Sequence, residues 1–278
     1  MVVNSSIKVN GVELHYEIHG AGNPLVLIHG LGSSSRSWKY QVPEFSKYYR
    51  VITFDCRGHG DSEKPENPQD YSIDLYVQDL KDLLYELEIV HVRLCGLSTG
   101  GNIAMQFTLD YPDKVKSLIL CSCVSEVNTH TFAERMTNKI GLPMEIFFYR
   151  ILGQERMAKF AAKYMYPKAK EEKYDLYLGD SLKISLPCLF QTRKSLAEFN
   201  CTANLKNIKC PTLIVRGEKE MIPIYYTNLL HENITNSKLQ IIKDAGHMTG
   251  LDNPEEFNRV HVTNPKLKEV HLKPTRKN

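Results

Sequence analysis

The feature that most constrains the fold of this chain is a series of short apolar runs separated by helical segments. Continuous runs rich in Val and Ile are typical of strands that are buried on both faces of a parallel sheet. From Ile73 to Leu87, apolar residues recur at three- and four-residue steps, which predicts a helix over 72–87. Strands that alternate with helices predict the α/β class. The predicted strands are 25–28, 51–54, 90–95, 118–120, 212–215 and 239–242.

Two segments depart from this alternation. Near the start, apolar and polar residues alternate around Asn10-Gly11, which predicts an antiparallel hairpin over 7–18. From 125 to 205 the chain is rich in Phe, Tyr and Met, and we interpret it as a helical cap inserted over the sheet, with these side chains mostly forming the cap's own core. The predicted organisation is a core of 1–124 and 206–262, a cap of 125–205 and a basic tail of 263–278.

The distribution of charge argues against some partners. The formal net charge is +3, but residues 258–278 carry +5, so the rest of the chain carries −2. A body near neutrality offers no broad face for phosphates, and we expect no nucleic-acid partner. No run approaches the 18 apolar residues that a membrane span needs, and the first residues do not resemble an export signal, so no membrane partner is expected. The oligomeric state cannot be read from the sequence.

The cysteines and histidines indicate the compartment and the chemistry. Seven cysteines form an odd set that lies mostly in apolar runs, where reduced thiols behave as small hydrophobic groups. This favours a reducing, cytoplasmic location. No CxxC or HExxH occurs and the histidines lack ligand spacing, so we predict no metal and no cofactor.

The strongest chemical motif is Gly96-Leu97-Ser98-Thr99-Gly100, which follows a predicted strand and precedes a helical stretch. In this context G-x-S-x-G holds a serine at a strained turn with its hydroxyl above the sheet edge, so Ser98 is the predicted nucleophile. The predicted strand 25–28 ends in His29-Gly30-Leu31-Gly32. Backbone N–H groups of Leu31 and Thr99 are therefore predicted to bind an oxyanion.

A serine nucleophile needs a base and a group that orients the base. His247 follows the last predicted strand, at the sheet edge where active sites of open α/β sheets lie. We predict that His247 is the base. Glu220, which follows the predicted strand 212–215, is the preferred acid, with Glu218 and Glu126 as alternatives.

These motifs together resemble the α/β-hydrolase family over about residues 7–262. The resemblance implies an eight-stranded, mostly parallel sheet whose second strand is antiparallel, and a helical cap after the sixth strand. It also implies Ser98 as nucleophile, His247 as base and the carboxylate after the seventh strand as orienting acid. Two features depart from the family pattern: Glu220 stands where close relatives usually carry Asp, and Asn264-Pro265 shortens the last helix. The matching pieces are 27–32, 54–62, 96–101, 217–220 and 245–247.

The function expected is a serine hydrolase that cleaves a small, largely apolar ester, lactone or related carbonyl compound by two-step acyl transfer. A cofactor-free carbon–carbon hydrolase, lyase or perhydrolase with the same triad is an alternative, and so is a ligand receptor that retains the triad. Dehalogenases and epoxide hydrolases are disfavoured because they carry Asp where this chain has Ser98. We interpret Asp55 and Arg57 as braces of a loop.

Overall fold

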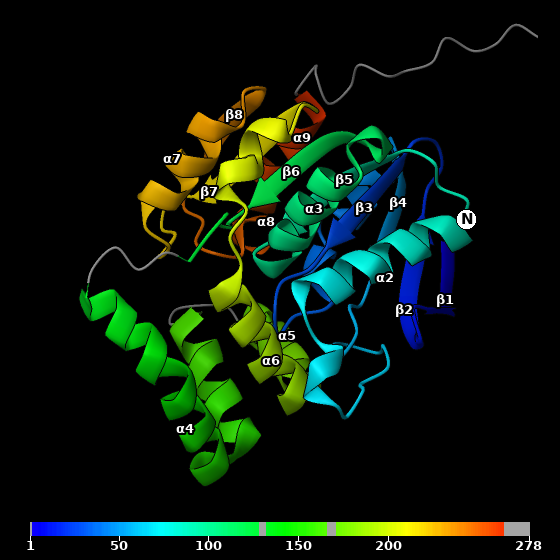
Figure 1. The fold of residues 1–278 in the computed structure, drawn as a ribbon. Helices are drawn as coiled ribbons and strands as arrows, with labels where there is room; N and C mark the ends of the chain where they lie inside the picture. The colour runs from blue at the N-terminus through cyan, green and yellow to red at the C-terminus, as the bar shows by residue number, and fades with distance from the viewer. Residues whose placement is uncertain (1, 128–131, 166–170, 264–278) are drawn as a thin grey trace, which may run out of the picture.

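Eight strands pair into one sheet at the centre of the computed structural model, which describes residues 2–127, 132–165 and 171–263 (Figure 1). Their order is β1-β2-β4-β3-β5-β6-β7-β8. β2 is antiparallel to both of its neighbours, and the remaining pairs are parallel, as predicted. The strands are β1 (Val2–Val9), β2 (Val12–His19), β3 (Pro24–Ile28), β4 (Arg50–Phe54), β5 (Val92–Leu97), β6 (Val115–Cys121), β7 (Thr212–Gly217) and β8 (Ser237–Ile242).

Helices cover both faces of this sheet, and the strands from β3 to β8 contribute to two apolar cores, whereas β1 and β2 contribute to the first alone. In β3, Val26 and Ile28 face the core beneath α2 and α3, whereas Leu25 and Leu27 face the core that contains Trp38 and the last helix. Alternation along a strand thus explains why the runs are continuously apolar. The helices of the sheet domain are α1 (Val42–Phe45), α2 (Ile73–Glu86), α3 (Thr99–Asp110), α7 (Ile224–Asn233), α8 (Thr249–Asp252) and α9 (Pro254–Thr263), with 3₁₀ turns η1 (Ser35–Trp38), η2 (Pro68–Asp70), η3 (Pro112–Lys114) and η4 (Thr202–Asn207).

Three further helices separate β6 from β7 and gather on one side of the sheet, where the sequence predicted a cap (Figure 1). The first contains a non-helical residue, Gly153, at which it kinks. In the part of the chain that the structure describes, these helices are α4 (Phe132–Met165), α5 (Glu171–Lys183) and α6 (Leu186–Glu198).

Two predictions about local structure are wrong. The fifth strand begins at Val92 and not at Val90, which is 67% exposed, and it continues through Leu97 to the turn. The Phe and Met side chains of α4 were expected mostly in the cap core, yet Met144, Phe147 and Phe148 are exposed. An apolar pattern at helical spacing indicates a face but does not say what covers it.

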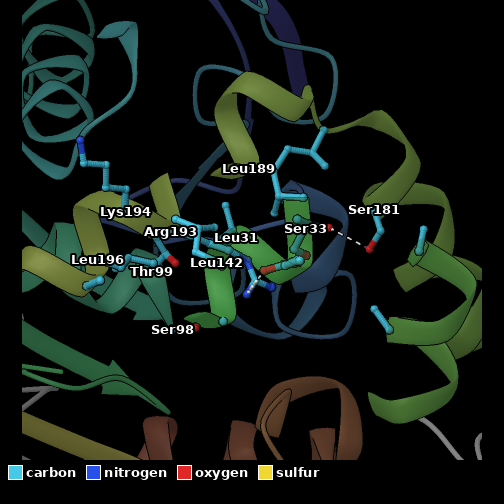
Figure 2. A pocket seen from close by; sticks show the side chains of 18 of the residues that line it. Leu31, Ser33, Ser98, Thr99, Leu142, Ser181, Leu189, Arg193, Lys194 and Leu196 are labelled. Carbon is cyan, nitrogen blue, oxygen red and sulfur yellow. Dashed lines mark hydrogen bonds and ion pairs between the residues drawn. The ribbon is translucent and has the colours of Figure 1, made fainter. Parts of the chain in front are cut away.

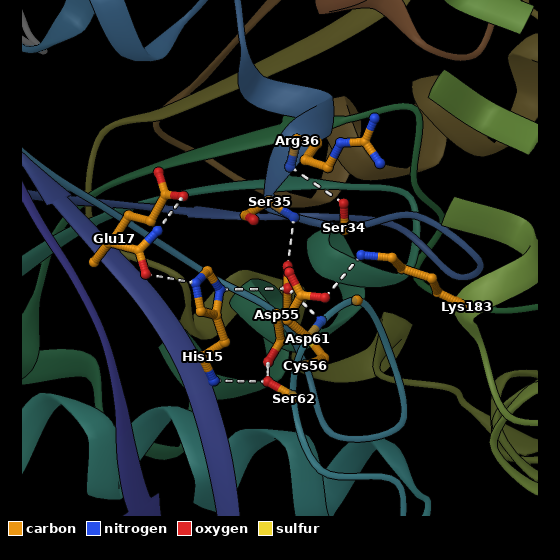
Figure 3. Close-up of polar contacts among 12 residues, drawn as sticks. His15, Glu17, Ser34, Ser35, Arg36, Asp55, Cys56, Asp61, Ser62 and Lys183 are labelled. Atoms are coloured by element: carbon orange, nitrogen blue, oxygen red, sulfur yellow. Dashed lines mark hydrogen bonds and ion pairs between the residues drawn. The ribbon is translucent and has the colours of Figure 1, made fainter. Parts of the chain in front are cut away.

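The predicted bracing role of Asp55 and Arg57 is confirmed. Asp55 accepts backbone N–H bonds from Ser35 at 2.7 Å and Asp61 at 2.9 Å, which tie two loops together (Figure 3). Arg57 is buried and binds the Asp79 carboxylate through Nε at 2.6 Å and through Nη2.

Some predictions are left open by this structure. The basic tail lies outside the described residues from 264 onward. The assignment of 1–124 with 206–262 and of 125–205 as separate domains stays a prediction. None of the described helices has the length and apolar character required to cross a membrane.

Candidate active site

The turn between β5 and α3 places Ser98 in a strained backbone conformation. Its φ is +53° and its ψ is −119°, a region that non-glycine residues rarely adopt. Close packing requires glycine on both sides: a Cβ on Gly96 would overlap the backbone of Gly100, and a Cβ on Gly100 would overlap the carbonyl oxygen of Ile28. The spacing of the motif is therefore a packing requirement of this turn.

His247 and Glu220 meet although they lie on different loops. The Nδ1 atom of His247 lies 3.1 Å from Oε1 and 3.0 Å from Oε2 of Glu220, whose side chain is 1% exposed. Ile222 N–H also donates to Oε1 at 3.1 Å. Burial raises the pKa of Glu220, but the hydrogen bond and charge of His247 outweigh it and lower the pKa to about 2. The carboxylate is therefore ionised at neutral pH and can hold the Nδ1–H tautomer.

The two alternative acids lie elsewhere. Glu218 is exposed, and its Oε2 accepts the Asp244 N–H at 3.0 Å. Glu126 is buried and forms a β-bridge with Asn200. Of the three carboxylates that the sequence left open, the structure brings Glu220 to His247.

Two polar residues that the sequence analysis did not single out support this pair. Arg216 is buried, and its Nη2 donates to the carbonyl oxygens of Glu220 at 3.1 Å and Ile222 at 2.6 Å. Asp252 accepts the Gly246 N–H at 2.8 Å through Oδ2, which fixes the turn just before His247. The position of Arg216 directly after the apolar run 212–215 was the available indication of its contacts. No local pattern indicated the contact of Asp252.

The loop after β3 approaches Ser98 from the other side. A Cβ on Gly30 would lie 3.2 Å from the Ser98 Cβ, so the two segments are in close proximity. His29 stiffens this loop, because its Nδ1 lies 2.8 Å from the Gly30 carbonyl oxygen and its Nε2 accepts the Cys56 N–H at 3.0 Å. Thr99 begins α3, where first-turn N–H groups have no partner within the helix.

A cavity of about 840 Å³ is lined by Ser98 and His247 and by residues of α4, α5 and α6 (Figure 2). Its wall is predominantly apolar, as in most small-molecule sites. An ion pair between Arg193 and Glu145, with 2.8 Å between Nη1 and Oε2, joins α6 to α4 at this wall. Burial raises the pKa of Glu145. From the sheet and the loops that adjoin it the lining includes Gly30, Leu31, Ser98, Thr99, His247 and Met248, and from α4, α5 and α6 it includes Leu142, Pro143, Ala158, Tyr177, Leu189 and Leu196.

One group of side chains outside this cavity has the composition of a metal site. Ligand atoms of His15, Asp55 and Asp61 lie within 4.8 Å of one another. However, Asp55 already accepts two backbone N–H groups, and the Lys183 ammonium lies 2.7 Å from Oδ1 of Asp61 (Figure 3). These contacts explain the cluster as a brace between loops without an ion.

Comparisons with known proteins agree with the fold. Residues 23–142 match the family model for the alpha/beta hydrolase fold. A serine hydrolase of Mus musculus, BPHL, is 28% identical over 270 residues, covering 93% of this chain and 85% of the relative.

Among solved structures, a bromoperoxidase from Bacillus anthracis has a TM-score of 0.84 at 28% identity, covering 96% of this chain and all of that one. An esterase from Exiguobacterium antarcticum has a TM-score of 0.83 at 25% identity, covering 94% of this chain and 98% of that one. The chain is an enzyme with the α/β-hydrolase fold, and its similarity to these proteins supports a hydrolase activity.

Proposed function

We propose that the protein is a serine hydrolase that cleaves a small, largely apolar ester, lactone or related carbonyl compound by two-step acyl transfer. The observation that carries this proposal is the contact of His247 with Glu220 at the wall of a cavity that also holds Ser98. A strained serine, an oriented imidazole and a mainly apolar cavity are the three parts that such a reaction needs. The names of the esterase and serine hydrolase relatives support the same reaction class.

In the first step, Ser98 Oγ attacks the carbonyl carbon while Nε2 of His247 takes its proton. The negative charge moves to the carbonyl oxygen, which the N–H groups of Leu31 and Thr99 receive. The tetrahedral intermediate then expels the alcohol, which leaves with the proton held by His247. In the second step, water gives a proton to His247 and attacks the acyl group, and collapse releases the acid while His247 returns that proton to Ser98 Oγ. Glu220 stays ionised throughout and fixes the imidazole through Nδ1–H.

The test is turnover of short-chain esters and lactones together with labelling by a serine-directed fluorophosphonate. Wild-type protein should react, and Ser98→Ala should lose both the label and turnover, whereas the surface variant Ser46→Ala should retain them. His247→Gln should lose almost as much turnover as Ser98→Ala. Turnover like that of the wild type in Ser98→Ala would refute the mechanism, and ligand binding without multiple turnover would favour a receptor.

A second candidate is perhydrolysis, which the similarity to the bromoperoxidase favours. Hydrogen peroxide would replace water in the second step and release a peracid; in the first step an ester still expels its alcohol, whereas a carboxylic acid expels water. Bromination of monochlorodimedone in the presence of peroxide, bromide and a carboxylic acid separates the two reactions. Peracid formation that outpaces ester hydrolysis would favour this candidate.

We also propose that residues 125–205 act as the cap that selects the substrate and that the enzyme works in the cytoplasm. The cap supplies much of the cavity wall, including Leu142, Leu189 and Leu196. Exchange of these leucines for alanine should shift preference toward longer acyl chains.

A further inference from the structure

Asp180 of α5 is a buried carboxylate whose two side-chain partners belong to the loop after β3. Ser34 Oγ donates to Oδ2 at 2.8 Å, and Nη1 of Arg36 lies 3.2 Å from Oδ1. The Asp180 side chain is 1% exposed, whereas Glu172 and Lys183 of the same helix are exposed. Burying a carboxylate is costly unless it is paired, so its partners are held in a narrow range of positions.

That loop is the one that carries the proposed oxyanion donor. Leu31 lies three residues before Ser34, and Ser181, next to Asp180, donates to the Gly32 carbonyl oxygen at 3.4 Å. From the sheet side, Asp55 accepts the Ser35 N–H at 2.7 Å, and within the loop Ser34 Oγ accepts the Arg36 N–H at 3.3 Å (Figure 3). The loop is thus held between a carboxylate of the sheet domain and a carboxylate of the cap.

We propose that Asp180 is a positioning residue for the oxyanion hole: acting through Ser34, it holds the loop so that the Leu31 N–H meets the negative charge of the transition state. This inference rests on the proposed serine hydrolase function. It makes the oxyanion hole a joint product of the two parts of the chain, complete only while α5 sits on the loop. A bond between residues 146 positions apart in the chain therefore links the substrate-binding cap to catalysis.

A second contact of α5 with the sheet domain provides the matched control. Lys183 Nζ lies 2.7 Å from Oδ1 of Asp61, and both side chains are largely exposed, at 43% and 60%. This ion pair also joins the cap to the sheet domain, but it ends outside the loop that carries Leu31. An effect that comes only from weakening the contact of α5 with the sheet should therefore appear in both Lys183→Met and Asp180→Ala. An effect that comes from displacing the Leu31 N–H should appear in Asp180→Ala alone.

The experiment measures kcat and KM on an ester that the wild type hydrolyses, and inhibition by butylboronic acid, which forms a tetrahedral adduct with the serine. Loss of a whole oxyanion donor costs about 10²- to 10³-fold, so a displaced donor should cost less. We expect Asp180→Ala to lower kcat about 10- to 100-fold, to leave KM within about 2-fold and to weaken boronic acid binding by a similar factor. Asp180→Asn keeps an acceptor for Ser34 and should recover most of kcat. Lys183→Met should match the wild type.

Ser34→Ala removes the same hydrogen bond from the loop side and should reproduce the kcat effect if Asp180→Ala fails to fold. Unchanged kcat in the folded variants would overturn the inference, and so would a loss confined to KM or shared equally by Lys183→Met. If the wild type has no Ser98-dependent turnover, the proposed function and this inference both fail. If the wild type shows normal Ser98-dependent turnover and Asp180→Ala leaves kcat unchanged, this inference alone is overturned.

Discussion

The imidazole of His247 contacts both carboxylate oxygens of Glu220, at 3.1 and 3.0 Å from Nδ1, across a gap of 27 residues in the chain. Glutamate reaches this position from the loop after β7, and its backbone carbonyl oxygen is fixed by Arg216. Together these contacts hold the carboxylate against Nδ1 of His247.

Glu220→Gln should lower kcat by about 10²- to 10⁴-fold, because an amide neither stabilises an imidazolium nor enforces the reactive tautomer. The change is measured as ester turnover at pH 8, with thermal unfolding as a check on folding. Glu218→Gln is the matched control, since that carboxylate binds the Asp244 N–H, and it should leave kcat unchanged. Near-normal turnover in Glu220→Gln together with collapse in Glu126→Gln would transfer the role to Glu126.

The pKa of Glu220, lowered from 4.5 to about 2, predicts how stability depends on pH. A carboxylate with a depressed folded-state pKa contributes stability that is present above its unfolded pKa, here near 4.5, and is lost as the pH falls toward 2. The contribution is on the order of 3 kcal/mol, since each pKa unit corresponds to about 1.4 kcal/mol. Urea unfolding should therefore show wild type more stable than Glu220→Gln at pH 5, with the difference shrinking toward pH 2.5. A difference that does not change with pH would contradict this origin.

Much of the architecture could be predicted because it depends on local patterns. Residues such as Val26 and Leu27 must be apolar whichever face they meet, so the buried strands are visible as runs. The boundary of β5 was less predictable because Val90 is apolar yet exposed, and only packing decides where a run enters the sheet. For the same reason, the spacing of Phe147 and Phe148 predicted a helix face without predicting its exposure.

In the candidate site, too, some residues could be predicted from the sequence and others could not. Ser98 and His247 could be selected because each lies at the end of an apolar run, where topology brings loops together. The choice among Glu220, Glu218 and Glu126 depends on side-chain direction within a loop, which spacing does not encode. Asp180 contacts Ser34 and Arg36, more than 140 positions away in the chain, and Asp252 accepts the Gly246 N–H six positions away. No pattern in the sequence records either contact.

Packing at the turn before α3 predicts that Gly100→Ala destabilises the protein. The added Cβ would overlap the backbone carbonyl oxygens of Ile28 and His29, which belong to the central sheet and its adjoining loop and cannot move away cheaply. We expect a loss of about 3 kcal/mol in the free energy of unfolding, measured in urea. Gly141→Ala in α4 is the control, because among the described residues no atom outside the adjoining helix backbone lies within 4 Å of its Cβ position. Alanine there should be neutral or stabilising by about 1 kcal/mol. Equal effects of the two variants would contradict the packing argument.

The buried pair of Arg57 and Asp79 predicts a large cost when one partner is removed. Both residues are at most 3% exposed, and Asp79 also accepts a hydrogen bond from Asn10 at 2.9 Å, so the carboxylate joins a loop, a helix and the opening hairpin. Asp79→Ala leaves the guanidinium buried without its counter-charge, which typically costs about 3–5 kcal/mol.

Equilibrium unfolding in urea is the measurement for this pair, and Lys47→Ala is its control. Lys47 pairs with Glu44 on the surface, where water solvates either charge after its partner is lost, so this variant should unfold at the wild-type urea concentration. Asp79→Leu separates the effect of lost volume from that of lost charge, because leucine fills the space but leaves Arg57 buried without a counter-charge. If charge and not volume decides the cost, Asp79→Leu should be destabilised nearly as much as Asp79→Ala, and a stability close to wild type in Asp79→Leu would show that packing alone matters at this position.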